Sequence, residues 1–384
     1  MSAPIAHMLI AKRVRERLKA TPDTATFATN VLDAHSQYMA LGSLGPDLPY
    51  FGWKSLIDPN LPIGVDEWSY QLHSKTPNVF PLHLIEVTGR TSDPTKKDWD
   101  KTDDCKFSFL CGYLTHMAAD QTIHPLVNAV AGSYYQDKSA RQEHKNCEIH
   151  QDLYILAQEH EGRLCRPQFD SYRFDQWCDI RRDTWKTRLH KGVGFSVWDI
   201  PWHVRQVVFP PPCPIEFVHY LQRAFVEAHA VTPSEFRIEL WIRALWWILR
   251  SLNGQRGWYN TAYKSLFDKE GAVKQDGHSY KRYIRLEGVP FKRLENYDAY
   301  LEEAVTLATI YIRAAHRMYL VNRISDPLRY TFKSVVVNAD LGAPLEQDAL
   351  QIAKTHLAQW DATYQRYAAF RKRPAECVLC AVIG

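Results

Sequence analysis

Apolar residues recur at intervals of three and four along most of the chain, which is the spacing of one face of an α-helix. Strand-like alternation of apolar and polar positions is scarce, and only residues 328–339 show it. The sequence therefore predicts a mainly α protein. The expected helices cover residues 6–19, 106–121, 141–162, 214–231, 233–252, 297–323 and 344–371.

The helical pattern is interrupted in two places. Proline and glycine residues between positions 43 and 80 indicate an ordered but irregular loop region. A second interruption falls near residues 190–215. We therefore expect a catalytic domain over residues 1–195 and a helical C-terminal region of unassigned role over residues 196–384.

Composition and charge exclude several classes of protein. The chain has 384 residues, of which 46% are hydrophobic and 23% charged, so it is not disordered, collagen-like or of low complexity. A formal net charge of +4 is too weak a bias to indicate a nucleic-acid binder. No apolar run is long enough for a transmembrane segment. The N-terminus has no signal-peptide order, which predicts a cytoplasmic protein with free thiols at its eight cysteines.

The strongest chemical signal lies on the apolar helix predicted over residues 106–121. His116, Asp120 and His124 follow one another at steps of four, so they share one face of a helix. Ionisable groups on a buried face are costly unless they pair with one another or bind a metal. Pro125 disfavours a helix interior, so we expect the helix to end near His124 and leave that side chain free to swing.

A second signal lies on the helix predicted over residues 141–162. His144 and Glu148 are also four residues apart, and imidazole with carboxylate is a ligand mixture that zinc accepts. Asp152 lies one further turn along, where it is expected to accept a hydrogen bond from a ligand histidine. Such a pair, taken alone, is more typical of the protein surface than of a metal site.

Three further candidates lie outside these helices. Asp47 sits within the stretch GSLGPDLPYF, where glycine and proline fix a tight turn, and a carboxylate held there suits metal ligation or general-base work. His7 lies in the first predicted helix and His73 in the loop region. Together the candidates suffice for a site of two or three metal ions, and sites of this composition commonly hydrolyse phosphoesters.

Four stretches give the chain a family resemblance. They are IAHMLIA, GSLGPDLPYF, GYLTHMAADQTIHP and HKNCEIHQD, in that order. Over roughly residues 5–155, and extending toward 190, the sequence resembles the bacterial zinc-dependent phospholipases C. The relatives of that family include the catalytic domain of glycosylphosphatidylinositol phospholipase D and, more distantly, the zinc nucleases that act on single strands.

The resemblance implies an all-helical bundle, here with a helical C-terminal extension, and two or three Zn²⁺ ions. It implies that Asp47 also acts as the general base. His35 and His83 remain alternatives to His73. The implied ligands are Asp47, His73, His116 and Asp120 for one ion, His124, His144 and Glu148 for a second, and His7 with bridging Asp120 for a third.

The implied activity is that of a zinc-dependent phosphodiester hydrolase resembling phospholipase C. Metal-bound water would attack the phosphorus of a phospholipid head-group ester, and peripheral contact with a membrane is compatible with that role. Two alternatives remain open from the residues themselves. The same metal site would act on nucleotides or single-stranded nucleic acid, or the protein would be a helical zinc-binding interaction protein without enzymatic activity.

Overall fold

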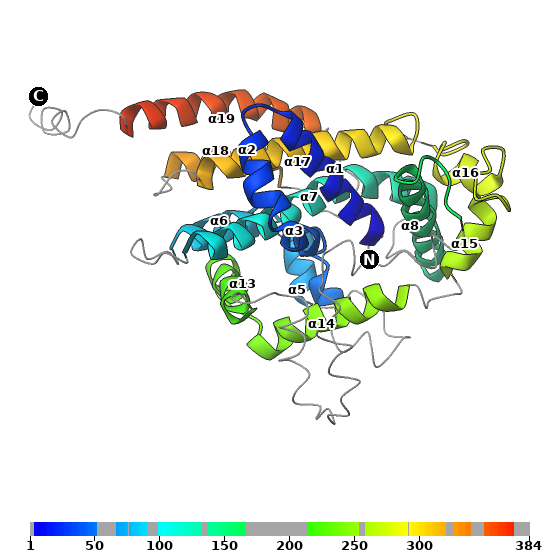
Figure 1. Ribbon diagram of the computed structural model, residues 1–384, viewed down its shortest axis with the longest axis horizontal. Coiled ribbons are helices and arrows are strands. Elements are labelled where there is room, and N and C mark those ends of the chain that lie inside the picture. Colours follow the sequence, from blue (N-terminus) through cyan, green and yellow to red (C-terminus); the bar gives the residue numbers. More distant parts are fainter. Residues whose placement is uncertain are drawn as a thin grey trace, which may run out of the picture.

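Two long helices, α7 and α17, pack against each other through the middle of the protein (Figure 1). This computed structural model describes residues 4–51, 67–75, 77–90, 99–132, 137–165, 214–252, 258–290, 292–319, 326–338 and 349–371. Within those residues the regular elements are all helices. Extended backbone pairing there is limited to two isolated β-bridges. The mainly α prediction is therefore confirmed.

The first half of the chain contributes ten of these elements, as far as the structure describes it. They are α1 (Pro4–Ala20), α2 (Ala25–Phe27), the π-helix η1 (Ala28–Asp33), α3 (Ser36–Gly42), the 3-10 helix η2 (Leu48–Phe51), α5 (Glu67–Tyr70), the π-helix η3 (Gln71–Lys75), α6 (Val79–Arg90), α7 (Trp99–Ala131) and α8 (Lys138–Gln158).

The second half adds helices that pack onto the first. They are α13 (Pro214–His229), α14 (Glu235–Leu252), α15 (Trp258–Leu266), α16 (His278–Tyr283), α17 (Tyr297–Tyr319), α18 (Asp326–Val335) and α19 (Ala349–Arg371). Helix α17 contacts α1, α6 and α7, α13 contacts α6, and α15 contacts α8. Residues 190–215 are largely outside the described residues, so the division at residue 195 stays a prediction. None of the described helices is long and apolar enough to span a bilayer.

Helix α7 is the central element because its side chains are buried on every side. It contacts α1, α3, α6, α8 and α17, and Leu110, Leu114 and Met117 are fully buried. A helix with apolar side chains around most of its circumference is stable only where all of its sides are buried. The polar face that carries the candidate ligands is therefore enclosed as well.

The predicted end of this helix near His124 is wrong, because α7 continues through Pro125 to Ala131. Proline removes one helical hydrogen bond, but the turn that follows buries Leu126 and Val127 completely. The burial offsets the lost bond. His124 consequently lies on a continuous helix and is not free to swing.

The strand-like interpretation of residues 328–339 is also wrong, since α18 covers Asp326–Val335. Leu328, Phe332 and Val335 are fully buried at a spacing of four and three, which is one face of a helix. The run of valines that suggested a strand lies at the end of this helix and just beyond it.

A pair of glycines lets α3 and α7 approach each other at backbone distance. A Cβ atom added to Gly112 would lie 2.0 Å from the carbonyl oxygen of Met39, and one added to Gly42 would lie 1.9 Å from that of Phe109. No side chain fits at either position. This contact holds the turn after α3 against the polar face of α7.

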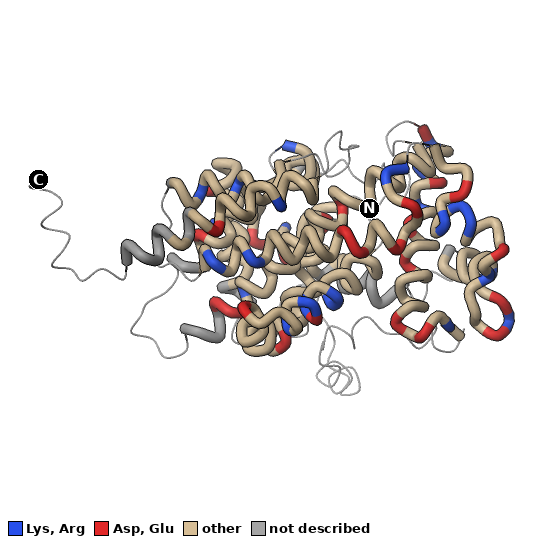
Figure 2. The backbone as a smooth tube through the Cα atoms, turned by 90° about the horizontal axis from the view of Figure 1, so that it is seen from above, with Lys and Arg blue, Asp and Glu red and all other residues tan. Residues whose placement is uncertain are grey.

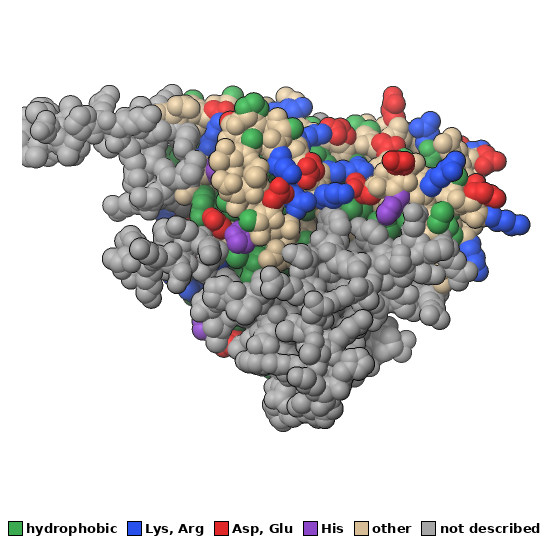
Figure 3. Space-filling view, viewed as in Figure 1, with side chains coloured by type: hydrophobic (Ala, Val, Ile, Leu, Met, Phe, Trp, Pro, Cys, Tyr) green, Lys and Arg blue, Asp and Glu red, His purple; other side chains and the backbone are tan. Residues whose placement is uncertain are grey.

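Basic and acidic residues are interspersed along the described chain (Figure 2), and their side chains lie next to one another on the face shown in Figure 3. On α1, Arg15 and Lys19 both pair with Asp33, and Lys12 pairs with Glu159. The basic residues of the first helix therefore form ion pairs with their neighbours. They do not form a patch of one sign.

The Gly112→Ala variant should lose about 1–3 kcal/mol of unfolding free energy or more, because the methyl group forces α3 and α7 apart. Urea unfolding of zinc-free protein measures this loss. Gly277→Ala is the comparison, since its added Cβ would lie 3.1 Å from the carbonyl oxygen of Lys274, a tight contact but a much smaller overlap than at Gly112, so its loss of stability should be smaller. Equal stability of Gly112→Ala and the parent protein would contradict the packing argument.

The stability of zinc-free protein should fall between pH 6.5 and pH 4 through His316. Burial lowers the pKa of His316 to about 4, although Asp23 nearby raises it. The unfolded chain, with a pKa of about 6.5, binds the proton more tightly, so stability falls as the pH falls toward 4. The complete loss is about 3 kcal/mol.

Urea unfolding at several pH values tests this expectation. The His316→Phe variant keeps the stacking on Phe27, whose ring centroid lies 4.1 Å from that of His316. Its unfolding free energy should depend less on pH than that of the parent. Identical pH dependence in the two proteins would rule the assignment out.

Candidate metal centre

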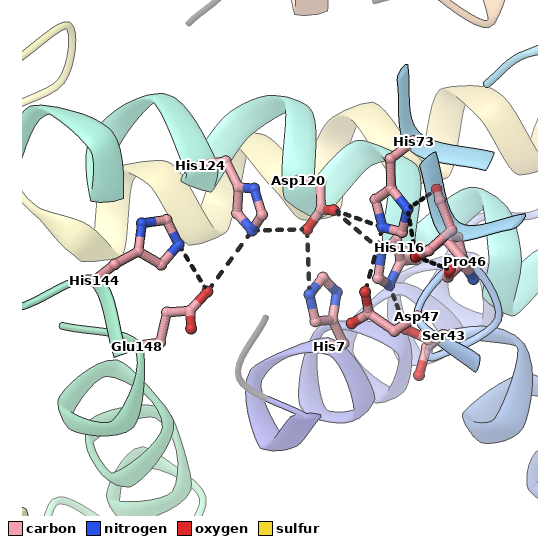
Figure 4. Close-up of polar contacts among 11 residues, drawn as sticks. His7, Ser43, Pro46, Asp47, His73, His116, Asp120, His124, His144 and Glu148 are labelled. Carbon is pink, nitrogen blue, oxygen red and sulfur yellow. Dashed lines mark hydrogen bonds and ion pairs between the residues drawn. The ribbon is translucent and has the colours of Figure 1, made fainter. Parts of the chain in front are cut away.

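Helix α7 presents three candidate ligands on one face at the centre of the protein (Figure 4). Asp120 lies between two histidines: its Oδ2 is 3.1 Å from His116 Nε2, and its Oδ1 is 3.4 Å from His124 Nε2. The helical spacing of four residues produces this order directly. Each carboxylate oxygen thus faces a different part of the cluster.

Asp47 and His73 approach from the loop region. Asp47 lies in the tight turn between α3 and η2, where its backbone N–H donates to the carbonyl of Leu44. His73 lies in η3, and its Nε2 is 3.3 Å from Asp47 Oδ1 and 3.8 Å from Asp120 Oδ2. The turn and the short helix therefore complete one side of the cluster.

Backbone carbonyls orient two of the histidines. His116 Nδ1 lies 2.9 Å from the carbonyl oxygen of Ser43, and His73 Nδ1 lies 2.8 Å from that of Ser69. Because Nδ1–H donates to a carbonyl in both rings, Nε2 is the nitrogen that faces the cluster and would bind a metal ion. Sequence reasoning missed these acceptors, because any residue type supplies a carbonyl.

Helix α1 contributes His7. Its Nε2 lies 3.3 Å from Asp120 Oδ1, and its ring stacks on His116 with centroids 4.2 Å apart. The other side of the cluster comes from α8, where His144 Nε2 lies 3.2 Å from Glu148 Oε1. The same oxygen is 3.8 Å from His124 Nε2. All eight residues predicted as ligands are therefore brought into one cluster.

The cluster is buried, and several of its polar atoms have no hydrogen bond. Asp120 and His116 are at most 1% exposed. Buried atoms that make no hydrogen bond are His7 Nδ1, His116 Nε2, both oxygens of Asp120, His124 Nε2 and Glu148 Oε1. Leaving one such atom unsatisfied costs about 1–3 kcal/mol. Buried imidazole nitrogens and carboxylate oxygens that converge in this way fit bound cations.

The electrostatics favour the same interpretation. Burial by itself would raise the pKa of Asp120, but His116 and His124 hold that pKa well below its usual range. Burial lowers the pKa values of His7 and His124, which keeps both rings neutral at pH 7. The pKa of His116 rises to about 9 despite its burial, because Asp120 and Asp47 face it. Without metal the cluster thus holds the ionised carboxylates of Asp47 and Asp120 around a protonated His116, and a metal ion would take the place of that proton.

Three groups of ligand atoms each lie within 4.8 Å of one another: those of His7, Asp47 and His116, those of His73, His116 and Asp120, and those of His124, His144 and Glu148. Imidazole nitrogen and carboxylate oxygen are the donors that zinc takes when cysteine is absent. The residues thus fit two or three zinc ions. Asp120 contacts atoms of all three groups.

The alternative histidines have other partners. His35 Nδ1 lies 3.3 Å from Cys105 Sγ, and His83 Nδ1 lies 3.0 Å from Glu86 Oε2. Asp152 was expected to accept from a ligand histidine, and that expectation is wrong. It accepts instead from Ile5 and Ala6, whose N–H groups lie in the first turn of α1 and have no partner within the helix.

Comparison with known proteins gives one finding. A family model described as zinc dependent phospholipase C matches residues 6–191, just under half of the chain. No curated protein and no solved structure matches the chain. The matched segment includes all eight residues of the cluster.

Two substitutions should distinguish the ligand groups of the cluster by the number of zinc ions that each removes. Glu148→Gln should remove one zinc equivalent per chain, because only the group on α8 contains Glu148. Asp120→Asn should remove more than one, since its oxygens face His7, His116 and His124. Metal analysis of purified protein by mass spectrometry measures both.

Glu143→Gln is the matched control on the same helix. Glu143 pairs with Arg282 outside the cluster, at 2.9 Å, so its removal should leave the zinc content unchanged. Equal losses in Glu148→Gln and Asp120→Asn would contradict the arrangement of separate groups joined by Asp120.

Proposed function

We propose, from the premise that residues 6–191 belong to the zinc-dependent phospholipase C family, that the protein is a zinc-dependent phosphodiester hydrolase acting on a phospholipid head-group ester. The observation that carries the proposal is the convergence of buried ligand atoms without hydrogen bonds around Asp120. The lipid nature of the substrate is supported by the family match alone.

The described residues would hold the ions as three overlapping groups. His73, His116 and Asp120 form one, with Asp47 beside them, and His124, His144 and Glu148 form the second. His7, with Asp120 as a bridge, would hold a third ion. Zinc, when bound, supplies a Lewis acid that stabilises charge on phosphoryl oxygens and makes water a stronger nucleophile at neutral pH.

Asp47 is the residue that we assign to the attacking water. The carboxylate is 2% exposed, and burial is outweighed by His116 and His73, which keep the pKa of Asp47 well below its usual range. It is therefore ionised at neutral pH and accepts a hydrogen bond from the water. Accepting that bond would point an oxygen lone pair of the water toward phosphorus. Because the pKa of Asp47 is low, the carboxylate would take up the proton only from water that bound zinc has made more acidic.

Exposure indicates the side from which the substrate approaches. The side chain of His124 is 14% exposed, whereas those of His116 and Asp120 are at most 1% exposed. The phosphodiester is thus expected to reach the cluster beside His124 and the α8 group. The deep side, where Ser43 and Ser69 orient the rings, excludes water from the orienting hydrogen bonds.

A panel of substrates tests the reaction and its substrate class. Zinc-loaded protein should release head group from phosphatidylcholine vesicles faster than it cleaves single-stranded DNA or a small nitrophenyl phosphodiester. Faster cleavage of DNA would favour the nucleic-acid alternative. Full zinc content without hydrolysis of any of these substrates would favour the non-enzymatic alternative.

The Asp47→Asn variant should lose about 100-fold or more in kcat, the size of effect expected for a general base. Glu143→Gln, which lies outside the cluster, should retain the parent rate. Because Asp47 also belongs to a ligand group, the rate is compared at measured zinc content. An Asp47→Asn variant with full zinc and the parent kcat would contradict the role of Asp47.

A further inference from the structure

Asp152 is a buried carboxylate that the cluster itself does not use. It lies on α8 one turn after Glu148 and is completely buried. Its Oδ1 accepts from the backbone N–H of Ala6 at 2.7 Å, and its Oδ2 accepts from that of Ile5 at 3.4 Å. These are first-turn amides of α1, which have no partner within the helix.

The bond ties together two helices that contribute to different ligand groups. Helix α8 carries His144 and Glu148, whereas α1 carries His7, directly after Ala6. A carboxylate at a helix N-terminus satisfies free N–H groups and interacts favourably with the helix dipole. Asp152 thereby fixes the start of α1 relative to α8.

The position of His7 depends on how Asp152 holds the start of α1, because the His7 ring has no backbone acceptor such as those of His116 and His73. The rings of His116 and His73 are oriented through Nδ1, each by a backbone carbonyl. His7 Nδ1 is buried and makes no hydrogen bond. The ring of His7 is therefore positioned by its backbone and by stacking on His116.

The second half of the chain reaches the anchor through one hydroxyl group. Tyr259 on α15 is 4% exposed, and its Oη donates to Asp152 Oδ2 at 2.8 Å. Burial raises the pKa of Asp152 well above its usual range, and the hydrogen bonds from Tyr259, Ala6 and Ile5 oppose that rise. The Tyr259 hydroxyl thus orients the carboxylate of Asp152, which holds the start of α1.

We propose that Asp152, oriented by Tyr259, is a positioning residue that sets the zinc affinity of the ligand group containing His7. This inference rests on the proposed metal centre. It assigns the helical region after residue 195 a direct role: α15 supports the first turn of α1 through Asp152. His144 and Glu148 lie on the same helix as Asp152, so their positions relative to each other should not change when the bonds to Ile5 and Ala6 are lost.

The test compares Asp152→Asn, Tyr259→Phe and the control Ser265→Ala. Asparagine keeps the shape of the side chain but replaces one acceptor oxygen by an NH₂ group that opposes the N–H donors. Ser265→Ala removes another hydrogen bond between α15 and α8, from Ser265 Oγ to His150 Nε2 at 2.7 Å, without touching α1. Zinc affinities are measured by competition with a chromophoric chelator.

One zinc should bind at least about 10-fold more weakly in Asp152→Asn, the range found for residues that orient ligands. The same zinc should weaken by a smaller factor in Tyr259→Phe, and all zinc affinities should be unchanged in Ser265→Ala. If Asp152→Asn does not fold, Tyr259→Phe carries the comparison. Unchanged zinc affinities in both variants would overturn the inference and leave the metal centre intact.

Hydrogen exchange of zinc-free protein gives a second readout that does not require metal. The amides of Ile5 and Ala6 should exchange faster in Asp152→Asn than in the parent or in Ser265→Ala. Unchanged exchange would overturn the anchor. A parent protein that binds no zinc would overturn the metal centre, and with it the assigned effect on affinity.

Discussion

The carboxylate of Asp120, almost completely buried on α7, is the constraint on which the site depends. Its two oxygens face histidines from two helices, and neither oxygen makes a hydrogen bond. Inside a protein, a carboxylate without hydrogen bonds is destabilising unless positive charge lies next to its oxygens. In the proposed metal centre zinc ions would supply that charge, and metal binding would then be coupled to folding of the centre.

The surrounding fold is arranged to hold ligand atoms that arrive from distant parts of the chain. The glycine contact between α3 and α7 brings the carbonyl of Ser43 to His116 and the turn with Asp47 beside it. Helix α8 closes the opposite side, and Asp152 joins it to the start of α1. These contacts between helices thus fix the backbone positions, and the backbone positions determine where the ligand atoms lie.

The helix-borne part of the site was predictable from the sequence, because steps of four residues determine a shared face. This reasoning was sufficient for His116, Asp120 and His124 on α7, and for His144 and Glu148 on α8. It did not predict how the histidine rings are oriented. Backbone carbonyls have no sequence signature, so the acceptors for His116 and His73 could not be foreseen.

Local rules failed where tertiary packing outweighed them. Pro125 was expected to end α7, but burial of the following turn carries the helix onward to Ala131. The valines near residue 336 suggested a strand, yet the buried face of α18 is helical. Asp152 was assigned to a histidine, whereas it binds the start of another helix. Each outcome depends on a partner distant in sequence, which local patterns do not contain.

The central claim is that the buried histidines and carboxylates around Asp120 are zinc ligands. Crystals of protein purified without chelator, measured on both sides of the zinc absorption edge, test it most directly. Two or three anomalous peaks are expected between α1, α7 and α8, bounded by the ligand atoms of His73, His124 and Glu148. Hydrogen-bonded water in those positions and no anomalous peak there, after zinc has been supplied, would contradict it.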